Sequence, residues 1–220
     1  MIGSAILDMD GTILAKRSID FFCESFGLED ELKRIDKLSI ELPAYKITEK
    51  IAELLAGKRK QDLLNIFKTM PLSPGVEDFI DFLRKKNFYI SIATDSYQFL
   101  ADYLAKKLKI DSTYGNILQF KNNIITGKVL TQPRCLKISG CKEFSVCKLW
   151  FLRELKSKIG GINVSIGDGD SDICAFTEAD ISIAYRPRSD KLRRIAHFEV
   201  FNFYEVIRVI DKELRNRNLI

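Results

Sequence analysis

Short apolar segments alternate along the chain with stretches in which apolar residues recur at helical spacing. The apolar segments predict buried strands at residues 2–8, 89–94, 163–166, 181–185 and 198–201. The periodic stretches predict helices at residues 76–86, 97–108, 144–158, 173–179 and 204–215. This alternation is typical of an α/β fold, so we expect a doubly wound, mostly parallel sheet. Residues 114–131 instead predict an antiparallel ribbon with Asn122 and Asn123 at its turn.

One long stretch interrupts the alternation of strands and helices. Residues 18–70 show helical periodicity and almost no strand pattern. We therefore predict two parts of the chain. Residues 1–14 and 73–220 form the α/β core, and residues 15–72 form a small helical unit inserted just after the first strand.

The composition is that of a folded globular protein. Of the 220 residues, 46 % are hydrophobic, which is enough for one sizeable core, and 30 % are charged. The net charge of +5 fits either an anionic partner or a solvated basic surface. No basic segment with interleaved aromatic residues is present, so we do not expect nucleic acid as a partner. No apolar run approaches the ~20 residues of a membrane span, and the amino terminus lacks a signal-peptide pattern. We therefore expect a cytoplasmic monomer or homodimer that does not contact membranes.

The cysteines favour neither a zinc site nor a disulfide framework. The chain has five of them, Cys23, Cys135, Cys141, Cys147 and Cys174. They include no CxxC pair, and the single histidine is isolated, so a structural zinc site is not expected. A disulfide between Cys135 and Cys141 is conceivable if the source is a hyperthermophile, whereas free thiols are the simpler expectation.

Acidic residues follow two of the predicted strands. Asp8 and Asp10 come directly after the first strand, and Asp168 and Asp172 belong to the acidic loop after the strand 163–166. Because the carboxyl ends of parallel strands share one edge of a sheet, the two acidic segments can meet there. Carboxylates repel one another unless a cation joins them, and a cluster with only oxygen ligands suits Mg²⁺.

The acidic loop also has the D-x-D-x-D pattern of a calcium-binding EF-hand loop. Such a loop needs a bidentate glutamate at its twelfth position, where this chain has Ala179. The calcium alternative is therefore not favoured.

Two further positions are candidates for binding an anion. Thr94 ends a predicted strand, where its hydroxyl can donate to a phosphate oxygen or cap the next helix. Asp95 follows it and is unfavourable beside an anion unless its side chain points away, for example to cap the helix 97–108. A lysine from the helix before the acidic strand is expected to reach the site, with Lys148 as the candidate and Lys142 as its rival.

These segments together resemble a known family. Their order and spacing are similar to those of the four motifs of the haloacid dehalogenase superfamily. The corresponding segments are Asp8-Met9-Asp10-Gly11-Thr12, Thr94, Lys148 and the loop Gly167–Asp172. The helical unit resembles a C1-type cap, and the greatest likeness within the superfamily is to the phosphoserine phosphatases. The resemblance implies a Rossmann-like core and a Mg²⁺-dependent phosphatase that acts on a small phosphorylated metabolite.

The resemblance also implies a role for each motif residue. Asp8 would attack phosphorus to form an aspartyl-phosphate, and Asp10 would protonate the leaving alcohol and later deprotonate the attacking water. The implied Mg²⁺ ligands are Asp8, Asp10 through its backbone carbonyl, and Asp168, while Asp172 would either bind the ion directly or lie just behind its ligands. The implied phosphate-binding residues are Thr94 and Lys148, with Asp95 beside Thr94.

The cap departs from the phosphoserine phosphatase pattern. A cap glutamate there follows the second aspartate by seven positions and binds the substrate ammonium, whereas this chain has Arg17. Near the expected cap arginine the chain has Lys50. This inverted charge predicts a more anionic substrate, such as a sugar phosphate, a polyol phosphate or a phospho-carboxylic acid.

Two other functions remain open on the same scaffold. A phosphotransferase or mutase would pass the phosphoryl group to a second alcohol instead of water. A non-catalytic phosphate-binding protein would keep the fold without turnover. A haloalkanoate dehalogenase is disfavoured, because it would need neither Asp10 nor Mg²⁺.

Overall fold

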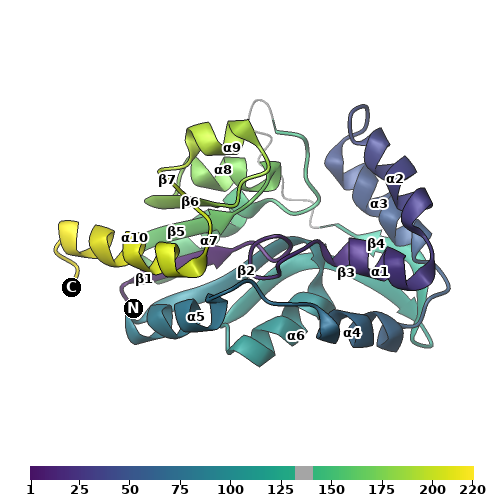
Figure 1. Cartoon of the computed structure of the whole chain (residues 1–220), viewed down its shortest axis with the longest axis horizontal. Helices are drawn as coiled ribbons and strands as arrows, with labels where there is room; N and C mark the ends of the chain where they lie inside the picture. Colours follow the sequence, from purple (N-terminus) through teal and green to yellow (C-terminus); the bar gives the residue numbers. More distant parts are fainter. Residues whose placement is uncertain (132–140) are drawn as a thin grey trace.

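The structure of the protein, a computed structural model, describes residues 1–131 and 141–220 (Figure 1). Cys135 lies outside the described residues, and with it the disulfide considered above. No disulfide joins any two of the described cysteines, Cys23, Cys141, Cys147 and Cys174. No helix in these two ranges is long and apolar enough to cross a membrane.

A single sheet of seven strands forms the centre of the molecule. The strands are β1 (Gly3–Leu7), β2 (Phe88–Tyr97), β3 (Ser112–Lys121), β4 (Ile124–Leu130), β5 (Ile162–Gly167), β6 (Ile181–Tyr185) and β7 (Phe198–Val200). Their order across the sheet is β4-β3-β2-β1-β5-β6-β7. All neighbouring pairs are parallel except β3 and β4, which form the predicted antiparallel ribbon. The predicted doubly wound, mostly parallel sheet is thereby confirmed.

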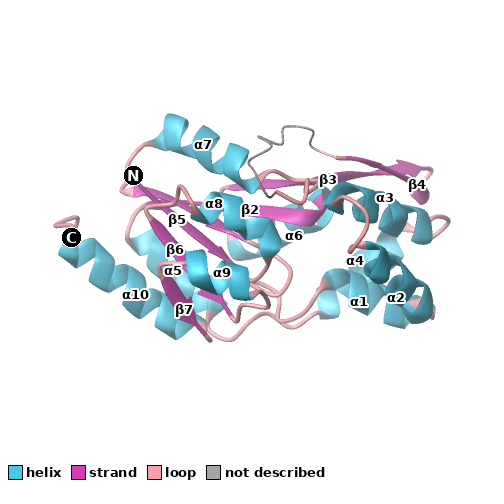
Figure 2. Ribbon diagram, turned by 90° about the horizontal axis from the view of Figure 1, so that it is seen from above, coloured by secondary structure: helices cyan, strands magenta, loops and turns pink. Residues whose placement is uncertain are grey.

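The helices of the described residues are α1 (Ser18–Phe26), α2 (Glu29–Leu38), α3 (Ala44–Leu54), α4 (Lys60–Thr69), α5 (Val76–Lys85), α6 (Gln98–Leu108), α7 (Lys148–Ile159), η1 (Asp170–Asp172), α8 (Ile173–Phe176), α9 (Asp190–Ile195) and α10 (Phe203–Asn216). Helices cover both faces of the sheet. Side chains of β1 alternate between two apolar clusters, because successive residues of a strand point to opposite faces. Ala5 and Leu7 pack in the cluster that includes α5, α6 and α10, whereas Ile6 packs with α7. Figure 2 shows α7 and α10 on opposite sides of the sheet.

Helices α1 to α4 lie together at one end of the molecule, beside the ribbon of β3 and β4 (Figure 1). The chain leaves the sheet and returns to it through two adjacent segments. Ala15 donates its backbone N–H to the carbonyl oxygen of Pro71 at 3.1 Å, and Ser73 donates to that of Ile13 at 2.8 Å. Two hydrogen-bonded connecting segments, residues 13–15 and 71–73, therefore attach the helical segment to the sheet.

The register of the sheet places residues of three neighbouring strands at one level. Leu7 of β1 pairs with Ile92 of β2 and with Ile166 of β5. Residues that directly follow these positions are consequently brought to one edge of the sheet. This edge faces the group of helices α1 to α4.

The helix predicted at 144–158 begins later than expected. Helix α7 starts at Lys148, and Cys147 caps it by accepting the backbone N–H of Trp150. The residues before it are not helical, because Ser145 and Val146 donate hydrogen bonds to the carboxylate of Asp95. The suggestion that Asp95 caps the helix after β2 is wrong for the same reason. Tyr97 occupies that cap position, without a side-chain hydrogen bond.

Candidate active site

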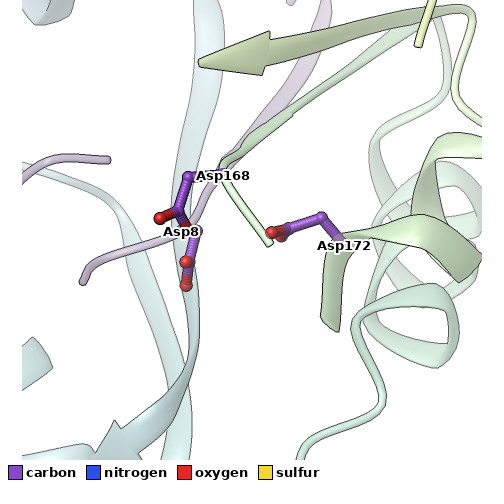
Figure 3. Close-up of side chains that lie close together, drawn as sticks. All are labelled: Asp8, Asp168 and Asp172. Carbon is purple, nitrogen blue, oxygen red and sulfur yellow. The ribbon is translucent and has the colours of Figure 1, made fainter. Parts of the chain in front are cut away.

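Three buried aspartates meet at the edge of the sheet. Asp8 follows β1, Asp168 follows β5, and Asp172 ends η1. One carboxylate oxygen of each lies within 4.8 Å of the others. Their residues are 6 %, 2 % and 1 % exposed, so bulk water screens their mutual repulsion poorly. Figure 3 shows Asp8 and Asp168 close together and Asp172 directed toward them from the other side.

Two glycines allow the carboxylates to approach so closely. Gly11 has a positive φ of 79°, and a Cβ there would overlap the carboxylate of Asp168. A Cβ on Gly167 would overlap the carboxylate of Asp172. Glycine is therefore required at both positions by the packing of the cluster as well as by the turn at Gly11.

Lys148 is the buried cation of the cluster. Its Nζ lies 2.8 Å from Oδ1 of Asp8 and 2.6 Å from Oδ1 of Asp172, and the residue is 2 % exposed. Burial lowers the pKa of Lys148, but the carboxylates of Asp172, Asp8 and Asp95 outweigh this effect and raise it above the ordinary value. The lysine is therefore fully charged at neutral pH. Its rival Lys142 is exposed and pairs with Asp170 at 2.8 Å, away from the three aspartates.

Within residues 1–131 and 141–220, the neighbours of the cluster do not balance its charge. Two described cations contact it: Lys148, and Arg188, whose Nε lies 2.6 Å from Oδ2 of Asp168. Burial and the neighbouring charge of Asp8 raise the pKa of both Asp168 and Asp172 to about 7. Oδ1 of Asp168 is buried and has no hydrogen-bond partner among the described residues. An unpartnered carboxylate oxygen within a cluster of excess negative charge fits a divalent cation with oxygen ligands.

We expect the metal-free protein to become less stable as the pH rises from about 4 to about 8. Asp168 and Asp172 hold protons in the folded state up to about pH 7, whereas the unfolded chain loses them near pH 3.8. The folded state thus binds more protons over this interval, and raising the pH favours unfolding. Because Mg²⁺ competes with those protons, its stabilising effect should be larger at about pH 8 than at about pH 5. Melting temperatures with EDTA and with Mg²⁺ at several pH values measure both effects, and a melting temperature that rises with pH in EDTA would contradict the account.

Asp10 lies beside the cluster and is held by the first residue of α1. The backbone N–H of Ser18 donates to Oδ1 of Asp10 at 2.7 Å, and the Ser18 hydroxyl donates to Oδ2 at 3.0 Å. Burial and the charge of Asp8 raise the pKa of Asp10 to about 7, although the hydrogen bonds from Ser18 act in the opposite direction. Asp10 is thus a carboxyl group that can exchange a proton near neutral pH.

Replacing Ser18 by alanine is expected to lower kcat about 10-fold to 100-fold. The substitution removes the hydrogen bond to Oδ2 of Asp10, so that carboxyl group is held only by the backbone N–H of residue 18. The pH at which kcat is half-maximal should also move upward, because a hydrogen bond that lowers the pKa of Asp10 is lost. A pH profile of kcat separates this effect from a loss of folded protein, which lowers the rate equally at every pH. An unchanged profile together with an unchanged kcat would exclude a role of Ser18 in holding Asp10.

The end of β2 supplies the next polar groups. Thr94 is buried, and its Oγ1 accepts the backbone N–H of Ser96 at 3.1 Å. The Ser96 hydroxyl lies 3.2 Å from that of Ser18, so β2 and α1 meet beside Asp10. Oδ1 of Asp95 accepts hydrogen bonds from Ser145 Oγ at 2.9 Å and from the backbone N–H of Val146 at 3.0 Å. Asp95 thereby secures the segment that leads into Lys148.

A pocket of about 740 Å³ opens above these residues, between the edge of the sheet and helices α1 to α3. Asp8, Asp10 and Thr94 lie in its wall. Arg17 also lines it, but its guanidinium donates two hydrogen bonds to Asp36, at 3.0 and 3.2 Å. Lys50 is half-buried on α3 and is not among the residues that line the pocket. The structure therefore brings together the predicted motif residues and Arg17, and it leaves Lys50 outside.

Sequence reasoning missed three residues of this site. Arg188, which pairs with Asp168, follows β6, and the end of a parallel strand was a signal that could have drawn attention to it. Ser18 and Ser96 carry no such signal, because their contacts with Asp10 and with each other depend on how the helical segment folds over the sheet.

Comparison with known proteins agrees with the geometry. The sequence pattern of haloacid dehalogenase-like hydrolases matches residues 5–177. A phosphoserine phosphatase of Campylobacter jejuni subsp. doylei is 28 % identical over 217 residues, covering 96 % of this chain and 100 % of that protein. A phosphoserine phosphatase of Lactococcus lactis subsp. lactis is 25 % identical over 214 residues, covering 96 % of both chains.

Solved structures share the fold. One described as a phospho-aspartyl intermediate analogue of phosphoserine phosphatase superposes with a TM-score of 0.81 at 22 % identity, covering 95 % of this chain and 99 % of that one. The family match spans most of the chain, and the two phosphoserine phosphatases align with it over at least 96 % of their length. The chain accordingly belongs to the haloacid dehalogenase-like hydrolases.

Proposed function

We propose that the protein is a Mg²⁺-dependent phosphomonoesterase that acts through an aspartyl-phosphate on Asp8. The observation that carries the proposal is the contact of a buried lysine with Asp8 inside a cluster of three carboxylates at the floor of a pocket. A phosphate dianion and a carboxylate nucleophile repel each other, so the site must supply positive charge where they meet. Lys148 supplies part of it.

The first half of the reaction transfers the phosphoryl group to the enzyme. An oxygen of Asp8 attacks phosphorus, the bond between phosphorus and the ester oxygen breaks, and the electron pair of that bond stays with the leaving oxygen. Protonated Asp10 donates its proton to this oxygen, and the alcohol departs. A pKa of about 7 allows Asp10 to be protonated at this stage.

The second half of the reaction hydrolyses the intermediate. Asp10, now ionised, takes a proton from a water molecule whose oxygen attacks phosphorus. The bond between phosphorus and Asp8 breaks, which restores the carboxylate and releases inorganic phosphate. Both halves use Asp10 at the same position, because Ser18 holds its carboxyl group through two hydrogen bonds.

We infer that the Mg²⁺ ligands are Asp8, the backbone carbonyl of Asp10, Asp168 and Asp172. The ion supplies charge neutralisation for the nucleophile and for the phosphoryl oxygens. Thr94 and Lys148 bind phosphoryl oxygens by donating hydrogen bonds. The carboxylate of Asp95 is occupied by Ser145 and Val146, so only its backbone N–H is available for the phosphate.

We propose that residues 15–72 act as a cap over a core made of residues 1–14 and 73–220. The paired segments at Ala15–Pro71 and Ile13–Ser73 form the natural hinge of such a cap. The substrate would be a small phosphorylated metabolite. The relatives are phosphoserine phosphatases by name, but Arg17 occupies the position at which the resemblance places a cap glutamate, which makes phosphoserine a poor match.

Release of phosphate from p-nitrophenyl phosphate tests the proposed function. We expect turnover with Mg²⁺, at least about 100-fold less turnover after treatment with EDTA, and recovery when Mg²⁺ is restored. Equal rates with and without the metal would contradict a Mg²⁺-dependent mechanism. Absence of turnover in the presence of Mg²⁺, together with tight Mg²⁺ binding, would identify a binding protein instead.

A further inference from the structure

The pocket above the aspartates is large for a small polar substrate. Its volume is about 740 Å³. A phosphoester with a three-carbon alcohol has about a dozen non-hydrogen atoms, which fill at most about half of this space even at the ~30 Å³ that each water molecule occupies in the liquid. Pockets of this size commonly hold ligands with a bulky organic part.

Part of the pocket wall is apolar. It is made by Ile19, Phe22, Leu42, Ile47, Ile51 and Phe144. Ile47 and Ile51 are four positions apart on α3, so both face the pocket from the same side of that helix. Ile40, also in the lining, is 89 % exposed at the rim. A large apolar side chain held in water at the entrance of a pocket gains contact area when an apolar ligand binds.

The basic side chains that line the pocket in the described ranges are already paired. Arg17 binds Asp36 at 3.0 Å, Lys142 binds Asp170 at 2.8 Å, and Arg188 binds Asp168 at 2.6 Å. A second anionic group on the substrate would have to share one of these cations with its carboxylate partner. Arg17 therefore offers less to an anionic substrate than its place in the sequence suggests.

Two hydroxyl groups on the helical side of the pocket have partners too. The hydroxyl of Ser39 donates to the backbone carbonyl of Asp36 at 2.6 Å, and that of Thr48 donates to Ser145 Oγ at 3.1 Å. Glu41 and Glu143, which also line the pocket, add negative charge. These carboxylates would repel a carboxylate on the substrate.

Resting on the function proposed above, we propose that the substrate is a phosphomonoester of an uncharged alcohol whose body is apolar and extends over about six carbons or more. The phosphate lies at Asp8 and Lys148. The alcohol carbons extend along the wall formed by α1 and α3 toward Ile40. Phosphoserine and other small, charged esters are then poor substrates.

A series of primary alkyl phosphates tests this substrate class, because the leaving alcohols have similar reactivity and differ only in apolar length. We expect kcat/KM to rise about threefold to fourfold per methylene from ethyl to butyl to hexyl phosphate, as the transfer of each CH₂ from water implies. A hexyl phosphate that carries a terminal carboxylate should react at least about 10-fold more slowly than hexyl phosphate. The kcat/KM for phosphoserine should be lower than that for hexyl phosphate.

Substitution of the wall gives a second readout. Ile47→Asn should lower the ratio of kcat/KM for hexyl phosphate to that for ethyl phosphate by at least about fivefold. Ile66→Asn is the matched control, since Ile66 is a half-buried isoleucine of α4 outside the pocket, and its ratio should stay that of the native protein. The ratio does not depend on how much of each variant is folded.

The outcomes separate the two proposals. Turnover of all esters with equal kcat/KM for ethyl and hexyl phosphate, or with phosphoserine as the best substrate, would overturn the apolar class and leave the phosphomonoesterase intact. Failure to hydrolyse any ester, including ethyl and p-nitrophenyl phosphate, would overturn the proposed function itself and the substrate class with it.

Discussion

Asp8→Asn is expected to lower kcat for phosphate release at least about 10⁴-fold while the protein remains folded. The amide of asparagine is a poor nucleophile. Of the two carboxylates of the cluster that contact Lys148, those of Asp8 and Asp172, only that of Asp8 lines the pocket. The substitution also removes a negative charge that raises the pKa of Asp10, Asp168 and Asp172. The metal-free variant should therefore melt at the same temperature as the native protein, or higher, at about pH 8. Loss of activity without loss of stability is the combined result that we expect.

Asp30→Asn is the matched control for this variant. Asp30 is 78 % exposed on α2 and pairs with Lys33 on the surface, so its substitution should leave both kcat and the melting temperature nearly unchanged. Steady-state phosphate release and thermal unfolding of both variants are the measurements. An Asp8→Asn enzyme that keeps more than about one hundredth of the native kcat would exclude Asp8 as the nucleophile.

Lys148→Met is expected to destabilise the protein by about 3–5 kcal/mol and to lower kcat/KM at least about 10³-fold. The lysine contacts Asp8 and Asp172 in a region that water does not reach. Methionine has a similar shape but leaves these carboxylates without their cation. The cost should fall when Mg²⁺ is added, because the ion then takes over part of the neutralisation.

Lys158→Met provides the comparison on the same helix. Lys158 is 69 % exposed on α7 and pairs with Glu154, so its substitution should change the free energy of unfolding by less than about 1 kcal/mol. Urea unfolding of both variants, with EDTA and with Mg²⁺, gives the two free energies. Equal stabilities for the two variants would show that the buried lysine does not hold the carboxylates together.

The fold could be predicted from the sequence because the pattern of apolar residues is governed by burial. The strands before Asp8 and Asp168 are apolar runs bounded by acid, and parallel strands that are central in a sheet end at the same edge. This is why two segments about 160 positions apart could be expected to meet, and their carboxylates do lie together. The ribbon was also foreseen, because Asn122 and Asn123 tolerate the positive φ that its turn requires.

What could not be predicted depends on contacts that local sequence does not encode. The start of α7 is set by hydrogen bonds from Ser145 and Val146 to Asp95, a residue 50 positions earlier. The neutralisation of Arg17 depends on Asp36, which α2 brings beside it. The sequence therefore suggested that Arg17 is an unpaired cation in the pocket, whereas in the fold it is paired with Asp36. The roles of the individual site residues, and the division into cap and core, stay predictions.

The central claim is that Asp8 becomes phosphorylated during turnover. Its most direct test is rapid acid quench of the Mg²⁺-loaded enzyme with hexyl phosphate or p-nitrophenyl phosphate, followed by digestion and mass spectrometry. We predict one phosphoryl group on the peptide that contains Asp8, at an occupancy that rises and then falls within a single turnover, and none in Asp8→Asn. Steady hydrolysis without any phosphorylated peptide, or with the label on another residue, would contradict the account.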